Sequence, residues 1–488
     1  MTDATAASRS APPTIASRLE PDAIGVAQDT VIGMANAAPT VSIGLTLALL
    51  ASSAAYAGGL IIILTAIPML IIANSYRRLN LWNANCGASF EWVGRAINPY
   101  LGFITGWLML AGSIMGTLSA ALVLGPSVLS VFGNSDTSGP WPDILIGTAV
   151  VLVMLVIAIV GIKITARTQV SIAVVEYVIL VGFAIAGIVF VLNHHHGTFP
   201  ITRSWFSLSG IGGKGSLSLG FLAAIFMFTG WEGTVYVNEE VQHRRVNPGR
   251  AAMLAVGIIA ILLAVSQFGL QGVVSPAKLQ ANGSSALVYV ANAIGGGGWA
   301  KVMALALALS VIACVGTGIV IEARMIYGMA SHRVLPTFLG NVSRRFSTPV
   351  AASIVVGLLL VVIAWVYLLS SSVANVFGEV IAIVGLLYIA FYILTAFAAL
   401  VYYRRRIFSS VWDAIFVALL PLAACAFLCW VLVKSLQGEA APEIWSIVAI
   451  VGLGVLLMLS ARFIQRSPFF QIPRESDTEV RTARHSSR

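Results

Sequence analysis

Long apolar runs separated by short polar stretches make up most of the 488-residue chain. The runs are at least as long as the roughly 20 residues that a helix needs to cross a bilayer, and they lack the short alternating pattern of a membrane β-strand. The pattern therefore predicts an all-α integral membrane protein of about twelve spans. The expected spans are 24–50, 54–75, 99–131, 143–162, 169–192, 217–238, 251–274, 299–328, 350–370, 375–401, 411–434 and 443–464.

The composition supports this interpretation. Hydrophobic residues make up 58% of the chain and charged residues only 10%, whereas a soluble domain has about 25% charged residues. Such apolar content excludes a soluble globular enzyme and a disordered chain. Long stretches outside the spans include the tails 1–23 and 465–488 and the loops 193–216 and 275–298. We expect the C-terminal tail to be solvated or to touch anionic lipid.

The distribution of positive charge predicts the orientation. With a cytoplasmic N-terminus, nearly all of the 28 Lys and Arg residues fall on the cytoplasmic side. The exceptions are Arg203, Lys214, Lys278, Lys301 and Lys434. The positive-inside rule thus predicts a multi-pass protein of the cell membrane (plasma or inner membrane) with both termini in the cytoplasm. The net charge of +9 is explained by topology, so we expect no nucleic-acid partner.

The sequence carries no motif for catalysis or for a bound cofactor. Its four cysteines, Cys86, Cys314, Cys425 and Cys429, lie at no metal-ligand spacing from a histidine. A Walker loop, an HExxH pair and a GxSxG elbow are also missing from the sequence. We therefore expect that the chain is not an enzyme and that it holds neither a cofactor nor a metal.

Two of the expected spans contain signals for a break in the helix. A non-helical stretch at membrane depth persists only where it lines a cavity, so a break indicates a site. The first span has Pro39, which lacks an N–H, among small residues, and the sixth has two glycines around a tryptophan and a carboxylate. The candidate site residues are Asn36, Ala37, Ala38, Pro39 and Thr40 in the first span and Phe228, Thr229, Gly230, Trp231 and Glu232 in the sixth.

The two breaks fall at corresponding positions if two five-helix halves, about 24–192 and 217–401, form an inverted repeat within a core of 24–401. Interrupted helices in such positions are the best sequence indicator of a transporter site. Exposed N–H groups at one half-helix end hold an anionic group, and free carbonyls at the other hold an ammonium group or a cation. A zwitterionic amino acid satisfies both. The spans within 411–464 are two additional helices.

Acidic residues inside the spans are expected to have a functional or structural role, because a charge at the bilayer centre costs about 2.5 to 3.5 kcal/mol on insertion scales. Glu176 is either a group that binds a proton or a cation next to the first span, or a structural hydrogen-bonding group. Glu232 is either a carboxylate facing an amine or a cap for the broken helix. We expect Glu322 to be mainly structural. Trp107 is a further candidate that could close over the substrate.

Four stretches resemble the amino acid-polyamine-organocation superfamily of secondary transporters, which has a leucine-transporter-like fold. They are GASFEWVGRA (87–96) leading to Gly102-Phe103 and Gly106-Trp107, FTGWE (228–232) followed by NEE (238–240) and NPGRA (247–251), ARMIYGMA (323–330) followed by Leu335-Pro336 and Thr348-Pro349, and GIK (161–163) leading to Ala166-Arg167. Two positions depart from the family pattern. The first span reads Asn36-Ala37-Ala38-Pro39 where many members have a Gly-Ser-Gly-like stretch, and Ser331-His332-Arg333 replaces an acid.

The resemblance implies a secondary transporter that works by alternating access on an amino acid or a related amine. Glu176 occupies the position where some proton-coupled members carry a lysine, so the resemblance implies a coupling residue, with H⁺ as the expected ion and Na⁺ as the alternative. Uptake by symport, exchange of amino acids or of polyamines and organic cations, and a transporter-like nutrient sensor stay open as functions. The expected partners are the small-molecule substrate and membrane lipid.

Overall fold

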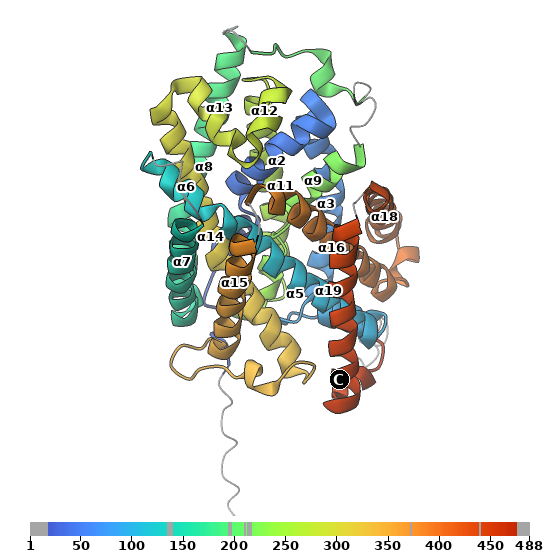
Figure 1. Ribbon diagram of the computed structural model, residues 1–488. Helices are drawn as coiled ribbons and strands as arrows, with labels where there is room; N and C mark the ends of the chain where they lie inside the picture. The colour runs from blue at the N-terminus through green and yellow to red at the C-terminus, as the bar shows by residue number, and fades with distance from the viewer. Residues whose placement is uncertain are drawn as a thin grey trace, which may run out of the picture.

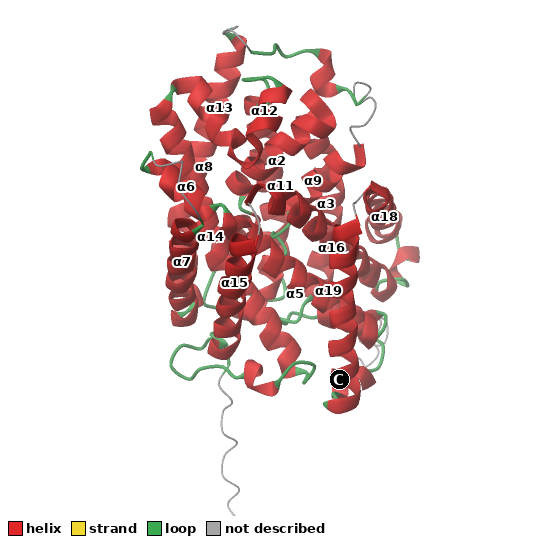
Figure 2. Ribbon diagram, viewed as in Figure 1, coloured by secondary structure: helices red, strands yellow, loops and turns green. Residues whose placement is uncertain are grey.

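The computed structural model describes residues 18–133, 140–193, 198–208, 211, 217–370, 373–438 and 441–475. Over this part of the chain the secondary structure is helical, and the one strand-like contact is an isolated bridge between Ile24 and Val241 (Figure 2). The helices form one upright bundle (Figure 1). The prediction of an all-α membrane protein is confirmed.

The first half of the chain contains the helices α1 (Val26–Ala37), α2 (Pro39–Ala54), α3 (Gly58–Trp82), α4 (Ser89–Ala96), α5 (Pro99–Leu122), α6 (Leu124–Val131), α7 (Trp141–Val160) and α8 (Ile162–Leu192). The second half contains α9 (Leu217–Phe228), α10 (Gly233–Tyr236), α11 (Asn247–Leu270), α12 (Pro276–Asn282), α13 (Ala286–Gly295), α14 (Gly297–Ser331), α15 (Val350–Ser370), α16 (Val373–Tyr402), α17 (Val411–Asp413), α18 (Leu420–Gly438) and α19 (Ala441–Leu459).

Ten helical stretches among the described residues are long and apolar enough to cross a membrane. The first of them, Val26–Trp82, is 57 residues long and holds two expected spans, α1 with α2 and then α3. The sixth expected span is interrupted, and only its first part, Leu217–Phe228, is a helix of more than one turn. Together these stretches account for every span that the apolar pattern predicts.

The helix boundaries differ from the prediction where basic residues continue a helix beyond its apolar run. Helix α3 extends to Trp82 and includes Arg77 and Arg78, and α8 begins at Ile162 and includes Lys163 and Arg167. These side chains lie at the end of a helix where they can reach water, so the helix need not stop where the apolar run stops. The apolar pattern also gives no sign of the short helices α4, α12 and α13.

The centre of the bundle is formed by α5, α14 and α16. In the most apolar 18-residue stretch of each span, 72% of the residues are buried in α5–α6, 83% in α14 and 78% in α16, against 28% in α7 and 11% in α19. Small residues on the central helices permit this close packing. For example, Gly318 in α14 lies directly against Thr117 in α5. The peripheral helices keep large apolar side chains facing outward.

We call the end of the bundle that holds the start of α1, the stretch after α10 and the end of α14 the basic end. Contacts between these distant segments close it. The backbone of the segment before α1 pairs with the stretch after α10, with Ala23 N donating to Glu240 O (2.8 Å) and Gln242 N donating to Ile24 O (2.9 Å). Glu240 also accepts two hydrogen bonds from the Arg324 guanidinium, at 2.7 and 3.0 Å, and both side chains are buried. The start of α1, the stretch after α10 and the end of α14 are thereby held together.

The segment 467–475 also packs on the basic end and does not extend into solvent as expected for a tail. The Phe469 ring is fully buried and stacks on Phe90 in α4, with 4.1 Å between the ring centroids. Glu475 pairs with Arg95 at 2.8 Å. Beside this contact, burial acts to raise the pKa of Glu91, but hydrogen bonds with His332 and Arg95, together with the charge of Arg95, outweigh it and lower that pKa to about 2. Glu91 is therefore ionised at physiological pH.

The contact between α8 and α11 generates a test of the packing. A Cβ atom on Gly269 would lie 2.3 Å from the Ala184 carbonyl oxygen, which is backbone and cannot turn away. A Cβ atom on Gly257, in the same helix, would meet nothing within 4 Å. We predict that Gly269→Ala lowers the melting temperature of the purified protein, while Gly257→Ala leaves it unchanged or raises it, since alanine favours a helix by about 1 kcal/mol. Equal melting temperatures for the two variants would contradict this packing.

Candidate functional site

The first span is broken at Ala38. This residue has the left-handed backbone conformation, with φ of 45° and ψ of 65°, and it ends α1 and starts α2. Pro39 follows at the first position of α2, where its missing N–H costs no hydrogen bond. The break therefore falls one residue before the proline. It leaves carbonyl groups at the end of α1 and N–H groups at the start of α2 close to each other, deep in the bundle.

The sixth span is broken between α9 and α10. Gly230 has a φ of 110°, which L side chains rarely adopt. A Cβ atom there would lie 2.6 Å from the backbone N of Ala37. The Asn36 side-chain amide also donates to the Gly230 carbonyl at 3.1 Å. The two breaks thus lie directly against each other, although they are far apart in the sequence.

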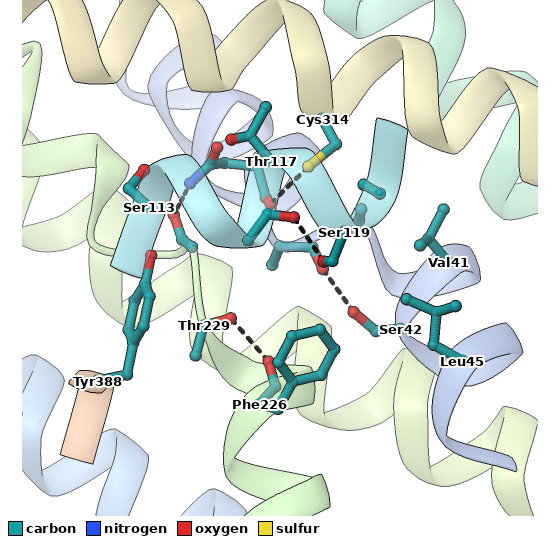
Figure 3. A pocket seen from close by; sticks show the side chains of 16 residues that line it. Val41, Ser42, Leu45, Ser113, Thr117, Ser119, Phe226, Thr229, Cys314 and Tyr388 are labelled. Atoms are coloured by element: carbon teal, nitrogen blue, oxygen red, sulfur yellow. Dashed lines mark hydrogen bonds between the residues drawn. The ribbon is translucent and has the colours of Figure 1, made fainter. Parts of the chain in front are cut away.

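A small pocket lies where the two breaks meet (Figure 3). Its cavity of about 30 Å³ has room for about one or two water molecules. Backbone ends, hydroxyl groups and apolar side chains surround it, and none of the described residues that line it carries a charged side chain. The lining residues are Asn36, Ala37, Ala38, Val41, Ser42, Leu45, Ser113, Gly116, Thr117, Ser119, Ala120, Phe226, Thr229, Gly230, Cys314 and Tyr388.

The pocket contains half of the residues predicted in the two breaks. Asn36, Ala37, Ala38, Thr229 and Gly230 line it. Pro39, Thr40, Phe228, Trp231 and Glu232 lie beside the breaks and do not reach the cavity. Phe226, two residues before Phe228, supplies the ring that faces it (Figure 3).

Trp107 lies away from the pocket. Its indole N–H donates to the Ile450 carbonyl oxygen in α19 at 2.8 Å, and its ring packs against Gly454. The residues of α5 that do line the pocket include Ser113, Thr117 and Ala120. At about 100° per residue these three share one face of the helix, and Trp107 lies on a different face.

Glu232 faces away from the cavity and caps the broken helix. Its two carboxylate oxygens accept hydrogen bonds from the Gly230 backbone N–H at 3.2 and 3.1 Å, and one of them accepts a third from the Tyr392 hydroxyl at 2.8 Å. The neighbouring Trp231 ring stacks on Tyr392, with 5.7 Å between centroids. Of the two interpretations of Glu232, the structure supports the backbone cap.

Glu176 is fully buried on α8 next to the start of α2. Its carboxylate is close to the hydroxyls of Thr40 and Ser310, but neither of its oxygens forms a hydrogen bond with another described residue. Ser310, in α14, accepts a hydrogen bond from the Val41 backbone N–H at 3.4 Å. Glu176 therefore borders the first break from behind the pocket wall, where it has unused hydrogen-bonding capacity.

Sequence analysis named only Trp107 on α5 and no pocket residue on α14 or α16. Glu322 in α14 accepts hydrogen bonds from two pocket-lining hydroxyls, Ser113 at 2.9 Å and Thr117 at 2.8 Å, and its second oxygen has no partner among the described residues. Glu322 thus places a buried carboxylate behind the pocket wall that Ser113 and Thr117 form. The signal for it was an acid inside an apolar run, but its hydroxyl partners lie more than 200 positions away in the sequence.

A second cavity of about 80 Å³ lies on the far side of Val41 and Leu45, which line both cavities. Its walls include α6 and the loop around Ser284 and Ser285 before α13. The basic end, in contrast, is closed beneath the pocket by the ion pair between Glu240 and Arg324.

Comparison with known proteins gives one family. The sequence model of a family described as "Amino acid permease" matches residues 29–456. An arginine/ornithine antiporter, ArcD2 of Lactococcus lactis, is 20% identical over 59% of this chain and 62% of its own length. The mouse Asc-type amino acid transporter 1 is 28% identical over 29% of this chain and 26% of its own length. The aligned parts cover less than two thirds of both relatives.

A solved structure of MhsT in complex with L-phenylalanine has a similar fold. The superposition has a TM-score of 0.59 and covers 85% of this chain and 99% of MhsT, at 14% sequence identity. The agreement extends over nearly the whole bundle. At this identity it shows a shared fold, and it confirms the fold class that the sequence motifs imply.

The contact between the two breaks can be tested at Gly230. Gly230→Ala would force a side chain into a positive-φ position and against the Ala37 backbone, and strained backbone of this kind costs on the order of 1–3 kcal/mol. We predict a lower melting temperature for this variant in detergent. Gly182→Ala in α8 is the matched control, because a Cβ atom there meets nothing within 4 Å. A Gly230→Ala variant as stable as the control would show that the breaks do not support each other.

Proposed function

The chain belongs to the amino acid permease family, and on that premise we propose that it is a secondary transporter that moves an amino acid across the cell membrane by alternating access. The observation that carries the proposal is the pocket at the two helix breaks, which is lined by backbone ends and hydroxyl groups. Half-helix N–H groups hold a carboxylate, and half-helix carbonyls hold an ammonium group. A zwitterion matches this lining.

The orientation of Glu232 favours an amino acid over a polyamine. A polyamine needs carboxylates in the site, but both oxygens of Glu232 are occupied by Gly230 and Tyr392. The described lining residues include no acidic or basic side chain, so the side chain of the substrate would be neutral. Because the cavity is small, Phe226 and Tyr388 would have to move when the substrate binds.

The hydroxyls of α5 would contribute to selectivity. Ser113 and Thr117 each donate their proton to Glu322, which leaves their lone pairs as the groups that face the pocket. This wall of the site therefore accepts hydrogen bonds and does not donate them. An N–H or O–H donor of the substrate would be placed against it.

We infer that the basic end faces the cytoplasm and that the structure represents a state closed on that side. The positive-inside rule supports the orientation. The buried pair between Glu240 and Arg324, together with the pairing of Ile24 with Val241, supports the closed state. The second cavity beyond Val41 and Leu45 would then be the route from the outside to the pocket.

Glu176 is the residue that we propose couples transport to a proton. It is buried, it lacks a hydrogen bond from the described residues, and it lies beside Thr40 at the first break. Protonation would remove a charge from this position and so change the relative stability of two arrangements of α2 and α8. Na⁺ is the alternative, with Glu176 and nearby oxygens as ligands.

Exchange is the second candidate mode of transport. ArcD2 is an antiporter by name, and exchange of two amino acids uses the same alternating-access pocket. The two modes differ in whether a proton gradient or a second amino acid drives accumulation.

Uptake into proteoliposomes tests the proposed function. The purified chain would be reconstituted and supplied with labelled neutral, basic and acidic amino acids, polyamines and small amines, with and without an inward proton gradient. We expect a neutral amino acid to accumulate under the gradient. Uptake of that amino acid only into liposomes preloaded with unlabelled amino acid would establish exchange. Transport of polyamines alone would overturn the proposed substrate class.

The role of Glu176 is tested by Glu176→Gln, which keeps the shape but removes the charge change. We predict loss of gradient-driven accumulation with retained exchange of preloaded substrate. Glu322→Gln is the matched control, because it also neutralises a buried acid but lies behind Ser113 and Thr117. It should change the apparent affinity and retain coupling. Full gradient-driven uptake by Glu176→Gln would rule out the proton-coupling role.

A further inference from the structure

A groove on the outer surface of the bundle lies between α3, α11 and the start of α18, away from the pocket at the breaks. Its volume is about 380 Å³. The apolar part of its wall consists of Leu70, Ile71, Met253, Phe416 and Leu420. Phe416 belongs to a π-helical turn, Ala414–Leu419, which precedes α18. Figure 1 shows α18 at the edge of the bundle.

The polar part of the groove is basic. Arg77 and Arg78 line it together with Asn74. Arg77 is held by two hydrogen bonds to the Asn74 side chain, at 3.2 and 2.9 Å. Arg250, at the start of α11, lies close enough to Arg77 for their charges to repel. These positive charges are concentrated where α3 ends and α11 begins.

The described residues at the groove supply one acidic side chain against these arginines. Asp413 lies 3.6 Å from Arg78, and both side chains are partly exposed. The Nε atom of Arg78 is buried and has no hydrogen-bond partner among the described residues. The groove thus has an excess of positive charge and an unused donor. An anionic group would neutralise the excess charge and accept a hydrogen bond from the Arg78 Nε atom.

The residues next to the groove place its arginines, Arg77 and Arg78, at the membrane surface. Phe408 and Trp412 are 90% and 71% exposed, respectively, and they follow the run Arg404–Arg406. Exposed aromatic residues next to a basic run are typical of the headgroup level. The apolar wall continues from this level along α3 into the hydrocarbon region. A ligand that fits has a charged head and an apolar chain.

We propose that this groove binds an anionic phospholipid of the membrane. The lipid phosphate would contact the guanidinium groups of Arg77 and Arg78, and one acyl chain would lie along Met253, Phe416 and Leu420. Basic pockets between membrane helices on the cytoplasmic side recognise anionic headgroups in this way. The bound lipid would bridge α3 and α11, which contact each other closely, to the peripheral α18.

Native mass spectrometry of the purified chain tests the site by titration with phosphatidylglycerol and with phosphatidylcholine of the same acyl chains. We expect the double variant Arg77→Gln/Arg78→Gln to weaken binding of phosphatidylglycerol about tenfold or more and to leave phosphatidylcholine binding nearly unchanged. The control for net charge is Arg344→Gln/Arg345→Gln, another pair of adjacent arginines, which is exposed in the loop before α15. This control should bind phosphatidylglycerol like the wild type.

A second variant tests the apolar part with the arginines intact. Leu420→Trp would fill the groove and should also weaken phosphatidylglycerol binding, while glycerol 3-phosphate, which has no acyl chain, should compete poorly. Equal weakening in both arginine double variants would overturn the site, because it would reflect net charge alone. Equal affinity for the two lipids, or effective competition by glycerol 3-phosphate, would overturn the lipid assignment.

Discussion

The hydrogen-bonding demand of the backbone inside a membrane is the constraint on which this structure depends. A broken helix at membrane depth leaves N–H and C=O groups without partners, and each such group costs several kcal/mol in hydrocarbon. Here side chains from the two broken segments supply partners for the Gly230 backbone. The Asn36 amide holds the Gly230 carbonyl, and Glu232 holds the Gly230 N–H. Residues of both breaks line the pocket, so the same constraint that brings the breaks together also places the candidate binding site.

The three buried acids differ in their hydrogen-bond partners. Glu232 is fully occupied by the backbone and by Tyr392, and it stabilises the sixth-span break. Glu322 uses one oxygen to orient Ser113 and Thr117. Glu176 has no hydrogen bond among the described residues. Of these three acids, Glu176 is therefore the one with the fewest hydrogen bonds to its surroundings.

Local sequence signals predicted most of the fold but only part of the site. Long apolar runs define the spans, and Pro39 and Gly230 mark the breaks, because these signals depend on a residue and its near neighbours. Which side chains point into the pocket depends on how the backbone unwinds at the break. For this reason Phe226 and not Phe228 lines the pocket. Ser113, Cys314 and Tyr388 come from three other helices. Their convergence depends on packing over long sequence separations, which periodicity does not encode. The sequence placed Trp107 among the site candidates for the same reason, because only the structure shows that the pocket-facing side of α5 carries Ser113, Thr117 and Ala120.

The closed basic end would set a condition for the proposed alternating access. Glu240 and Arg324 form two hydrogen bonds with each other and are shielded from water. Separating such a pair without replacement partners leaves two uncompensated buried charges, at a cost of about 3–5 kcal/mol. Opening this end therefore requires water to reach both side chains as they part. The segment before α1 lies on the same contact through the hydrogen bond from Ala23 to the Glu240 carbonyl. Movement of that segment would admit water to the ion pair, so displacement of the N-terminal segment and opening of the basic end are expected to occur as one step.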